Sequence, residues 1–427
     1  MDSDFLPSKP KRPTKATDPT ENTEAGEELT PVNDTDPTES FDVPDDDGHE
    51  SLDENPEESS APAEDSGKPK GKKKRRNPKQ WFLDLSKKQK IIFVIVLIVL
   101  LAGSTVGVYA LTKSKSPVNT PNKQTSVKKD TKPKTEASRL TGVQISPDLN
   151  KRGVTGIMIE NSQEARPQSG LKDAGVVFEA IAEGGITRFL ALFQESQPDY
   201  IGPVRSVRPY YLDWVQGFDA PIVHAGGSAD GLAKIKADGV KDLDQFANGN
   251  SFTRVSNRAA PHDLFTSTAQ LDALKKSKGF ETSAFTGFAR KKEAASKSPN
   301  ARTIDLAISS SLFNVHYDYD AKTNSYLRSE GGASHTDEKS GAQLSPKVVV
   351  ALVMEQGRDG VYTTYNSLGN GSCIVFQDGI VTEGSWYKGN SKDQITFKDS
   401  RGEVLKLNPG QTWVTAVGSA TAVTYQP

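Results

Sequence analysis

The chain has 427 residues, a single cysteine and a formal net charge of -2 at pH 7. One cysteine excludes an internal disulfide framework. The small net charge conceals two opposite segments: residues 1–67 hold 21 acidic and 4 basic side chains, and residues 68–90 hold 11 basic side chains and one acidic one. Neither segment has the apolar content to bury a core, so a folded domain must lie further along the chain.

Residues 1–67 are rich in Pro, Glu, Asp, Ser and Thr. Such a segment buries too little apolar surface to offset the entropy lost on ordering, so the composition predicts a disordered acidic tail. A tail that is only solvated and a tail that recruits a protein partner both fit this pattern.

Residues 91–111 (IIFVIVLIVLLAGSTVGVYAL) carry no charge and directly follow the basic juxtamembrane segment 68–90. About 20 such residues in a helix cross ~30 Å of hydrocarbon, which predicts one transmembrane helix. Basic residues beside a span stay in the cytoplasm, so we expect a cytoplasmic N-terminus and an extracytoplasmic C-terminal module. Membrane lipid is then a partner through the anchor helix, and nucleic acid is excluded as a partner of the exported part.

Residues 112–140 are rich in Lys, Thr, Ser and Pro and are predicted to form a stalk. Residues 141–281 mix strand and helix patterns. Two apolar runs around the Gly-Gly pair at 184–185 predict a β-hairpin. We expect Ser206 to cap a helix through VRPYYLDWVQGF, and a later helix to end at Gly279.

Residues 282–427 consist mostly of short strand-like runs separated by turns such as QDG and NPG. Cys373, in the run SCIVF, is predicted to be a small buried strand residue. The exported part is therefore predicted to be α+β. It would comprise a mixed α/β N-terminal lobe and a β-rich C-terminal lobe, tethered by one transmembrane helix.

Several blocks of the exported part resemble one known family. These are ENSQEARPQSGLKDAGVVFEAIAEGGITRFLALFQ, IGPVRSVRPYYLDW, VHAGGS and APHDLF, with EGSWYK and LNPGQTWV further on. They are similar to the YerB family of bacterial cell-envelope proteins, and the resemblance covers residues 141–427. It implies a place outside the membrane, where members are described as lipoproteins, and it implies no reaction or ligand.

This chain departs from the lipoprotein pattern at one position. The segment LAGS at 101–104 has Ser104 where a lipoprotein needs the cysteine that carries the lipid. We therefore expect the uncut helix 91–111 to be the anchor.

The predicted hairpin supplies candidate acid/base residues. In a regular hairpin, Ile181 lies opposite Arg188, and the side chains of Glu179, Glu183 and Arg188 then share one face. Two carboxylates beside a guanidinium are a possible acid/base pair for a hydrolase or transferase. A structural ion-pair ladder fits the same pattern.

Two segments predict an anion-binding site. IGPVRSVR places two arginines around a helix start, where backbone N–H groups and the helix dipole favour an anion. VHAGGS leads from a strand through a glycine turn to a helix cap, which predicts a second backbone pocket. The alternative is that the arginines pair with carboxylates of the chain itself. The candidate ligand-binding residues are Arg205, Arg208, His224, Gly226, Gly227 and Ser228.

His262, in APHDLF, is a further candidate general base, although a histidine that only forms hydrogen bonds within its loop fits as well. The chain has no HExxH, CxxC or aspartate-rich loop, and we predict no metal site. The glycine turn is neither a Walker A loop nor a dinucleotide fingerprint, so no cofactor is assigned.

Three functions stay open. The first is binding of an anionic envelope ligand, such as a wall polymer or a lipid-linked glycan phosphate, at the arginines and the glycine turn. The second is an envelope hydrolase or transferase that uses Glu179, Glu183 or His262. The third is a scaffold whose acidic tail recruits a cytoplasmic partner.

Overall fold

The computed structural model describes residues 134–427. The predicted acidic tail, juxtamembrane segment, transmembrane helix and most of the stalk lie outside these residues. No helix among residues 134–427 combines the length and the apolar character that a bilayer span requires. The first described strand, β1 (Glu136–Ala137), pairs with β2 (Gln144–Ile145). It lies within the segment 112–140 that the sequence predicts to be a stalk, so the folded part begins before residue 141.

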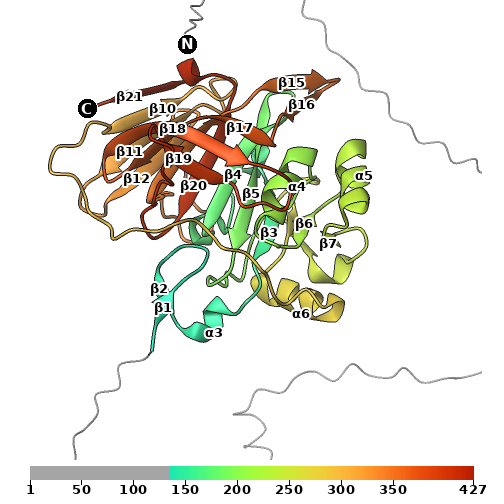
Figure 1. Ribbon diagram of the computed structural model, residues 1–427. Helices are drawn as coiled ribbons and strands as arrows, with labels where there is room; N and C mark the ends of the chain where they lie inside the picture. The colour runs from blue at the N-terminus through green and yellow to red at the C-terminus, as the bar shows by residue number, and fades with distance from the viewer. Residues whose placement is uncertain (1–133) are drawn as a thin grey trace, which may run out of the picture. The chain divides into compact units, whose positions relative to one another are not determined.

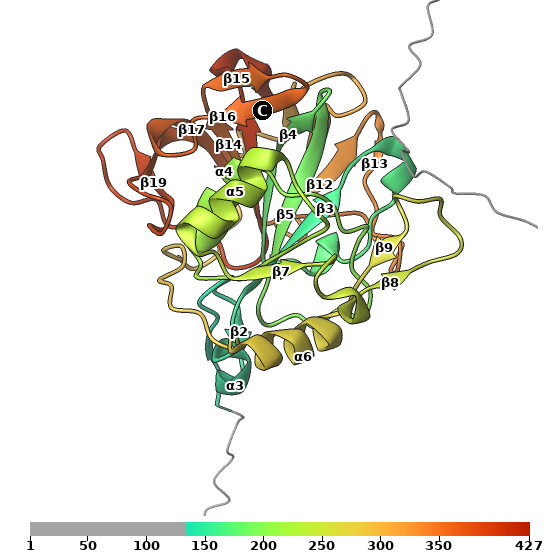
Figure 2. The same cartoon turned by 90° about the vertical axis from the view of Figure 1, so that its right-hand side faces the viewer.

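A mixed twelve-stranded sheet forms the centre of the fold (Figures 1 and 2). Strands from both predicted lobes share it. Ten of these strands follow one another from edge to edge in the order β19 (Thr396–Asp399), β18 (Ile380–Lys388), β17 (Gly369–Gln377), β14 (Val348–Val353), β20 (Thr412–Val417), β4 (Val176–Glu183), β5 (Ile186–Phe193), β3 (Thr155–Glu160), β6 (Ile222–His224) and β7 (Asp242–Asp244). The other two strands form a side branch, in which β16 (Tyr362–Tyr365) pairs with β4 and with β15 (Gln356–Asp359).

The order of the strands joins the two halves of the chain. β20, near the C-terminus, lies between β14 and β4 and is parallel to both. The sequences VVVALV of β14 and TGIMIE of β3 are almost continuous apolar runs, as expected for strands that are covered on both faces.

A second sheet covers the C-terminal part of the large one (Figure 1). Its five strands are antiparallel, and Tyr317 and Tyr326 from this sheet pack with Val349 and Phe376 of the large sheet in one buried cluster. In order these strands are β13 (Ala333–Ser334), β12 (Ser325–Glu330), β11 (Val315–Asp320), β10 (Thr303–Leu306) and β21 (Val423–Gln426). A separate pair consists of β8 (Thr253–Arg254) and β9 (Leu264–Phe265).

Helices cover both faces of the N-terminal part of the large sheet (Figures 1 and 2). On one face, the buried cluster contains Trp214 of one helix and Ile235 of the next, packed with Met158. On the other face, Leu271 packs with Phe189. The helices are α3 (Pro147–Asn150), α4 (Pro209–Gln216), α5 (Ala229–Asp238) and α6 (Thr268–Lys278), with α4 and α5 on the first face and α6 on the second.

The ends of the elements confirm most of the turn and cap predictions. The glycines at 184–185 both have positive φ, +56° and +78°, as the predicted two-residue hairpin requires. α6 ends at Gly279, which is left-handed at φ +72°. The predicted cap at Ser206 is wrong, because α4 begins only at Pro209 and the Ser206 hydroxyl instead donates to the carbonyl of Ala225 at 2.9 Å.

The α+β class, with a mixed first half and a β-rich second half, is confirmed for the described residues. Cys373 lies buried in β17, as predicted, and burial raises the pKa of its thiol to about 12.

Candidate functional site

Charged side chains gather at the end of the large sheet where β3 stops and β4 turns into β5. Glu160 lies opposite Arg188 in the register of β3 and β5, so their side chains point to the same face. The chain after β5 crosses this end, because the N–H of Arg205 donates to the carbonyl of Met158 at 3.0 Å. We call the following residues the surface cluster: Glu160, Glu183, Arg188, Arg205, Arg208 and His262.

Glu183 is held by two arginines of this cluster. Arg188 and Arg208 each donate to one of its carboxylate oxygens, and their other terminal nitrogens donate to the carbonyls of Ser206 and Val207 at 2.8 and 2.7 Å. Burial alone would raise the pKa of Glu183, and the two guanidinium groups outweigh it and lower the pKa. This arrangement favours the ion-pair interpretation of Glu183 over an acid/base role.

Glu160 binds two further members of the cluster with its two oxygens. Its Oε1 lies 3.1 Å from Nε of Arg205, and its Oε2 lies 3.0 Å from Nδ1 of His262. The hydroxyl of Ser162 donates to Oε1 at 3.2 Å. Glu160 is buried, whereas 27% of the Arg205 side chain and 19% of the His262 side chain are exposed. A buried carboxylate therefore lies in contact with both a guanidinium and an imidazole, and each of these groups is partly exposed.

His224 and the glycine turn after it have partners within the protein. The two ring nitrogens of His224 lie 2.8 Å from the carbonyl of Gly226 and 2.9 Å from a carboxylate oxygen of Asp242. The N–H of Gly226 donates to Asp244 at 3.0 Å, and the N–H of Ser228 donates to a carbonyl. These groups are therefore committed to holding β6, β7 and the start of α5 together.

Gly227 has a packing reason for its small size. A Cβ atom built on it would lie 2.8 Å from a side-chain carbon of Val207, which is too close for any larger residue. The turn thus allows the segment before α4 to approach the start of α5.

The two predicted anion-binding segments do meet. Arg208 and Ser228 both line a small pocket of about 70 Å³, where the guanidinium of Arg208 lies 4.8 Å from the ring centre of Tyr362. Asp230 and Asp359 line the same pocket, and their negative charges disfavour an anion there. Arg205 lies in the other group, with Glu160.

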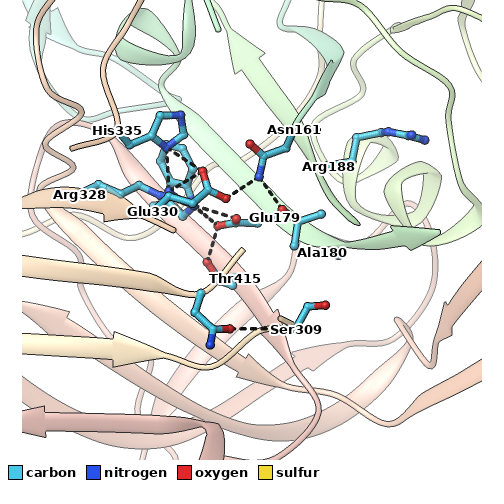
Figure 3. A network of polar contacts seen from close by, with 12 residues as sticks. Asn161, Glu179, Ala180, Arg188, Ser309, Arg328, Glu330, His335 and Thr415 are labelled. Carbon is cyan, nitrogen blue, oxygen red and sulfur yellow. Dashed lines mark hydrogen bonds and ion pairs between the residues drawn. The ribbon is translucent and has the colours of Figure 1, made fainter. Parts of the chain in front are cut away.

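The predicted shared face of Glu179 and Arg188 is wrong. A β-bulge at Ala182 shifts the register between β4 and β5, so Arg188 lies opposite Ala180, and Glu179 lies opposite Phe189. A shift by one residue moves a side chain to the other face of a strand. Figure 3 shows Arg188 directed away from the group around Glu179.

Glu179 instead belongs to a buried network on the opposite face (Figure 3). One terminal nitrogen of Arg328 donates to both oxygens of Glu179, at 2.8 and 2.9 Å, and neither side chain is exposed. Trp413 and Thr415 donate to the same carboxylate at 2.8 and 3.2 Å. Glu179 is therefore a structural anion that connects β4, β12 and β20.

The network continues to Glu330 and His335. Nδ1 of His335 accepts from Arg328 at 2.7 Å and Nε2 donates to Gln168 at 2.9 Å, and burial together with the nearby Arg328 charge lowers the pKa of His335 well below its usual value. Burial raises the pKa of Glu330 to about 7, although Arg328 and Arg166 pull it down. Asn161 donates to Glu330 at 2.6 Å.

Sequence reasoning missed the two acidic residues that organise these groups. Glu160 ends an apolar strand, and a charge at that position is the one local signal of a site. Glu330 lies in a strand of the second lobe and carries no local signal. Among residues 134–427, no three His, Cys, Asp or Glu side chains come together as metal ligands.

Comparison with known proteins bears out the resemblance. The chain matches a protein family of unknown function, DUF3048, with its N-terminal domain model at residues 140–281 and its C-terminal domain model at residues 304–414. It is 33% identical over 291 residues to "Putative lipoprotein YerB" of Bacillus subtilis strain 168, and the aligned region covers 65% of this chain and 85% of that protein. The crystal structure of YerB from Bacillus subtilis is similar with a TM-score of 0.63 and 27% identity, over 68% of this chain and 99% of that chain.

Proposed function

The chain belongs to the DUF3048 family of proteins of unknown function, and on this premise we propose that it is an extracytoplasmic module that binds an anionic ligand of the cell envelope. The ligand class is a phosphate-bearing glycan or wall polymer, and the binding site is the surface cluster. A relative that is named a lipoprotein supports a place at the membrane surface.

The guanidinium of Arg205 carries this proposal. Its one charged contact among residues 134–427 is the 3.1 Å approach of Nε to Glu160, an ion pair in which Nε makes no hydrogen bond. Its two terminal nitrogens are not engaged by any side chain or carbonyl of these residues. More than a quarter of the side chain is exposed, so these N–H groups face solvent. A guanidinium presents its N–H groups as a planar fork that fits two oxygens of a phosphate.

The rest of the surface cluster supports an anion at this position. Three guanidinium groups stand against two carboxylates, those of Glu160 and Glu183, so the cluster has an excess of positive charge. Arg188 and Arg208 are buried and held on Glu183, which makes them a fixed source of positive potential within the cluster. Glu179 and Glu183 are both held by arginines, and this ranks ligand binding above hydrolysis by these carboxylates.

Binding of poly(glycerol phosphate) to residues 134–427, measured by calorimetry, tests the proposal. The solved YerB structure consists almost wholly of the matched module, since the match covers 99% of that chain, so the module is suitable on its own. We expect Arg205→Ala to weaken binding about tenfold or more, because a hydrogen bond to a charged group contributes about 1.5–3 kcal/mol.

Arg152→Ala is the matched control. Arg152 is similarly exposed, has one carboxylate partner in Asp272, and precedes β3 at the end opposite Glu160. It removes the same charge away from the cluster and should leave binding unchanged. Equal affinity of the Arg205→Ala and Arg152→Ala variants would contradict the proposal.

We also propose that residues 91–111 hold the chain in the membrane as a transmembrane helix. A lipid anchor needs a cysteine ahead of the module. The single cysteine, Cys373, is buried within the module, and Ser104 occupies the corresponding position of LAGS. Residues 91–111 form the longest uncharged apolar run of the sequence, which supports this proposal.

A further inference from the structure

The imidazole of His262 is oriented like that of a general base. Its Nδ1 lies 3.0 Å from Oε2 of the buried Glu160, and this carboxylate oxygen accepts a hydrogen bond from Nδ1–H. The lone pair of the neutral ring is therefore on Nε2. Nε2 makes no hydrogen bond with residues 134–427, and 19% of the His262 side chain is exposed to solvent.

The guanidinium of Arg205 lies at the other oxygen of the same carboxylate, with Nε 3.1 Å from Oε1 of Glu160. We propose that His262 is a catalytic general base, positioned by Glu160, that promotes hydrolysis of a phosphodiester bound through Arg205. This deepens the proposed function, on which it rests, by assigning a reaction to the same site.

The backbone around the pair limits its movement. Glu160 ends β3, and its N–H donates to the carbonyl of Pro203 at 2.9 Å. The loop that carries His262 is closed by an ion pair between Arg254 and Asp263 at 2.6 Å. A base held in this way meets the geometric requirement for proton transfer without a large rearrangement.

The donors beside the base indicate the substrate class. Acyl transfer uses N–H groups aimed at a single developing oxyanion, whereas phosphoryl transfer spreads charge over several oxygens and is stabilised by guanidinium groups. Here the group adjacent to the base is a guanidinium with two open terminal nitrogens, in a cluster that has excess positive charge. A phosphodiester fits these donors better than a neutral ester.

The proposed hydrolysis conserves every atom and proton. Nε2 of His262 takes a proton from water as the water oxygen attacks phosphorus. The bond from phosphorus to the leaving oxygen then breaks. The leaving alkoxide takes a proton from solvent, and the imidazolium returns its proton to solvent. A phosphodiester and water thus give a phosphomonoester and an alcohol.

The other carboxylates of this region do not compete for the role. Glu183 is occupied by Arg188 and Arg208, and Glu179 is fully buried behind the sheet. Glu164 lies near His262 and is exposed, and its pKa is lowered mainly by a backbone hydrogen bond. Ser162 donates to Glu160. His262 is therefore the one group of the cluster with an accessible lone pair on a fixed ring.

Hydrolysis of bis(4-nitrophenyl) phosphate by residues 134–427, followed as release of 4-nitrophenolate, tests the proposal. We expect His262→Asn to lower kcat about 100-fold or more, as loss of a general base does. Poly(glycerol phosphate) should still bind to this variant, which shows that it is folded. His316→Asn is the matched control, because His316 also lies beside carboxylates, those of Asp305 and Asp318, but outside the cluster.

Glu160→Gln tests the positioning role. A neutral amide no longer stabilises the protonated ring that forms during the step, so kcat should fall while KM stays nearly the same. A merely structural role of Glu160 would lower the amount of folded protein and leave kcat per folded molecule unchanged.

The possible results separate the two proposals. Absence of hydrolysis by the wild-type module, or equal kcat for the His262→Asn and His316→Asn variants, overturns the catalytic inference even where polymer binding depends on Arg205. Polymer binding that is insensitive to Arg205→Ala overturns the proposed function itself.

Discussion

Glu330 is a carboxylic acid in an unusual position, with 2% of its side chain exposed and a pKa raised to about 7 by burial. Arg166 and Arg328 both contact Glu330, but Arg328 also binds Glu179. The two arginines therefore only partly offset the effect of burial on Glu330. The ordinary pKa of a glutamate side chain is 4.5. At a pH between 4.5 and about 7, the folded protein therefore holds a proton on Glu330 that an exposed glutamate releases.

This difference predicts how stability depends on pH. Because the folded state binds more protons than the unfolded state between about pH 4.5 and 7, the contribution of Glu330 is largest below pH 4.5 and is lost as the pH rises through 7. Urea unfolding of the wild-type module and of Glu330→Gln at pH 5 and pH 7.5 measures this. We expect the stability of the wild type relative to the variant to fall with pH, and a constant difference would contradict the assignment.

The Glu160–His262 pair illustrates what local sequence cannot predict. His262 was recognised as a candidate base from its type alone, but its orienting carboxylate is 102 residues away in the chain. Asp263, the adjacent acidic residue, binds Arg254 instead. Only the path of the loop over the end of β3 brings the pair together.

At the scale of elements, the hairpin of β4 and β5 was predictable and its register was not. The Gly-Gly turn sets the strand connection, and the structure has it at residues 184–185. The bulge at Ala182 turns Glu179 to the face where Arg328, 149 residues away in the chain, binds it. Arg188 keeps its contact with Glu183 on the other face. The bulge therefore depends on a partner that lies far from the hairpin in sequence. No pattern within the hairpin specifies such a choice.

The ion pair between Glu179 and Arg328 connects β4 of the large sheet with β12 of the small sheet. Arg328→Met removes the cation and leaves Glu179 charged and buried, so we expect a loss of about 3–5 kcal/mol in the free energy of unfolding, measured in urea. The double variant Glu179→Met, Arg328→Met should recover part of this loss, because Glu179 no longer remains as a buried charge without its partner.

Arg152→Ala provides the reference for a half-buried pair, that with Asp272, and should cost much less. A cost of the same size for Arg328→Met would show that the cross-sheet pair does not stabilise the packing of the two sheets.

At the scale of the whole molecule, sequence patterns predict the family and the α+β class. They also predict that helices lie mainly in the first half of the exported part and strands in the second. The sharing of one sheet by both halves does not, because strand order is set by contacts that are far apart in the chain. The anchor remains a prediction from residues 91–111.

Fractionation of cells that produce the full chain tests that anchor. The full chain should stay in the membrane pellet after alkaline carbonate extraction, and deletion of residues 91–111 should release it into the soluble fraction. Ser104→Ala is the control and should leave the chain in the pellet, since a retained helix does not depend on this side chain. A deletion variant that stays in the membrane would contradict a transmembrane anchor.

The position of β20 has a consequence for the order in which the protein is assembled. The ribosome makes β4 about 230 residues before β20, yet β20 fills the gap between β14 and β4. Until Thr412–Val417 has been synthesised, the edges of β14 and β4 that pair with this strand have no hydrogen-bonding partner. The sheet therefore closes only late in synthesis, and a chain that stops before Thr412 is left with an open, aggregation-prone edge at its centre.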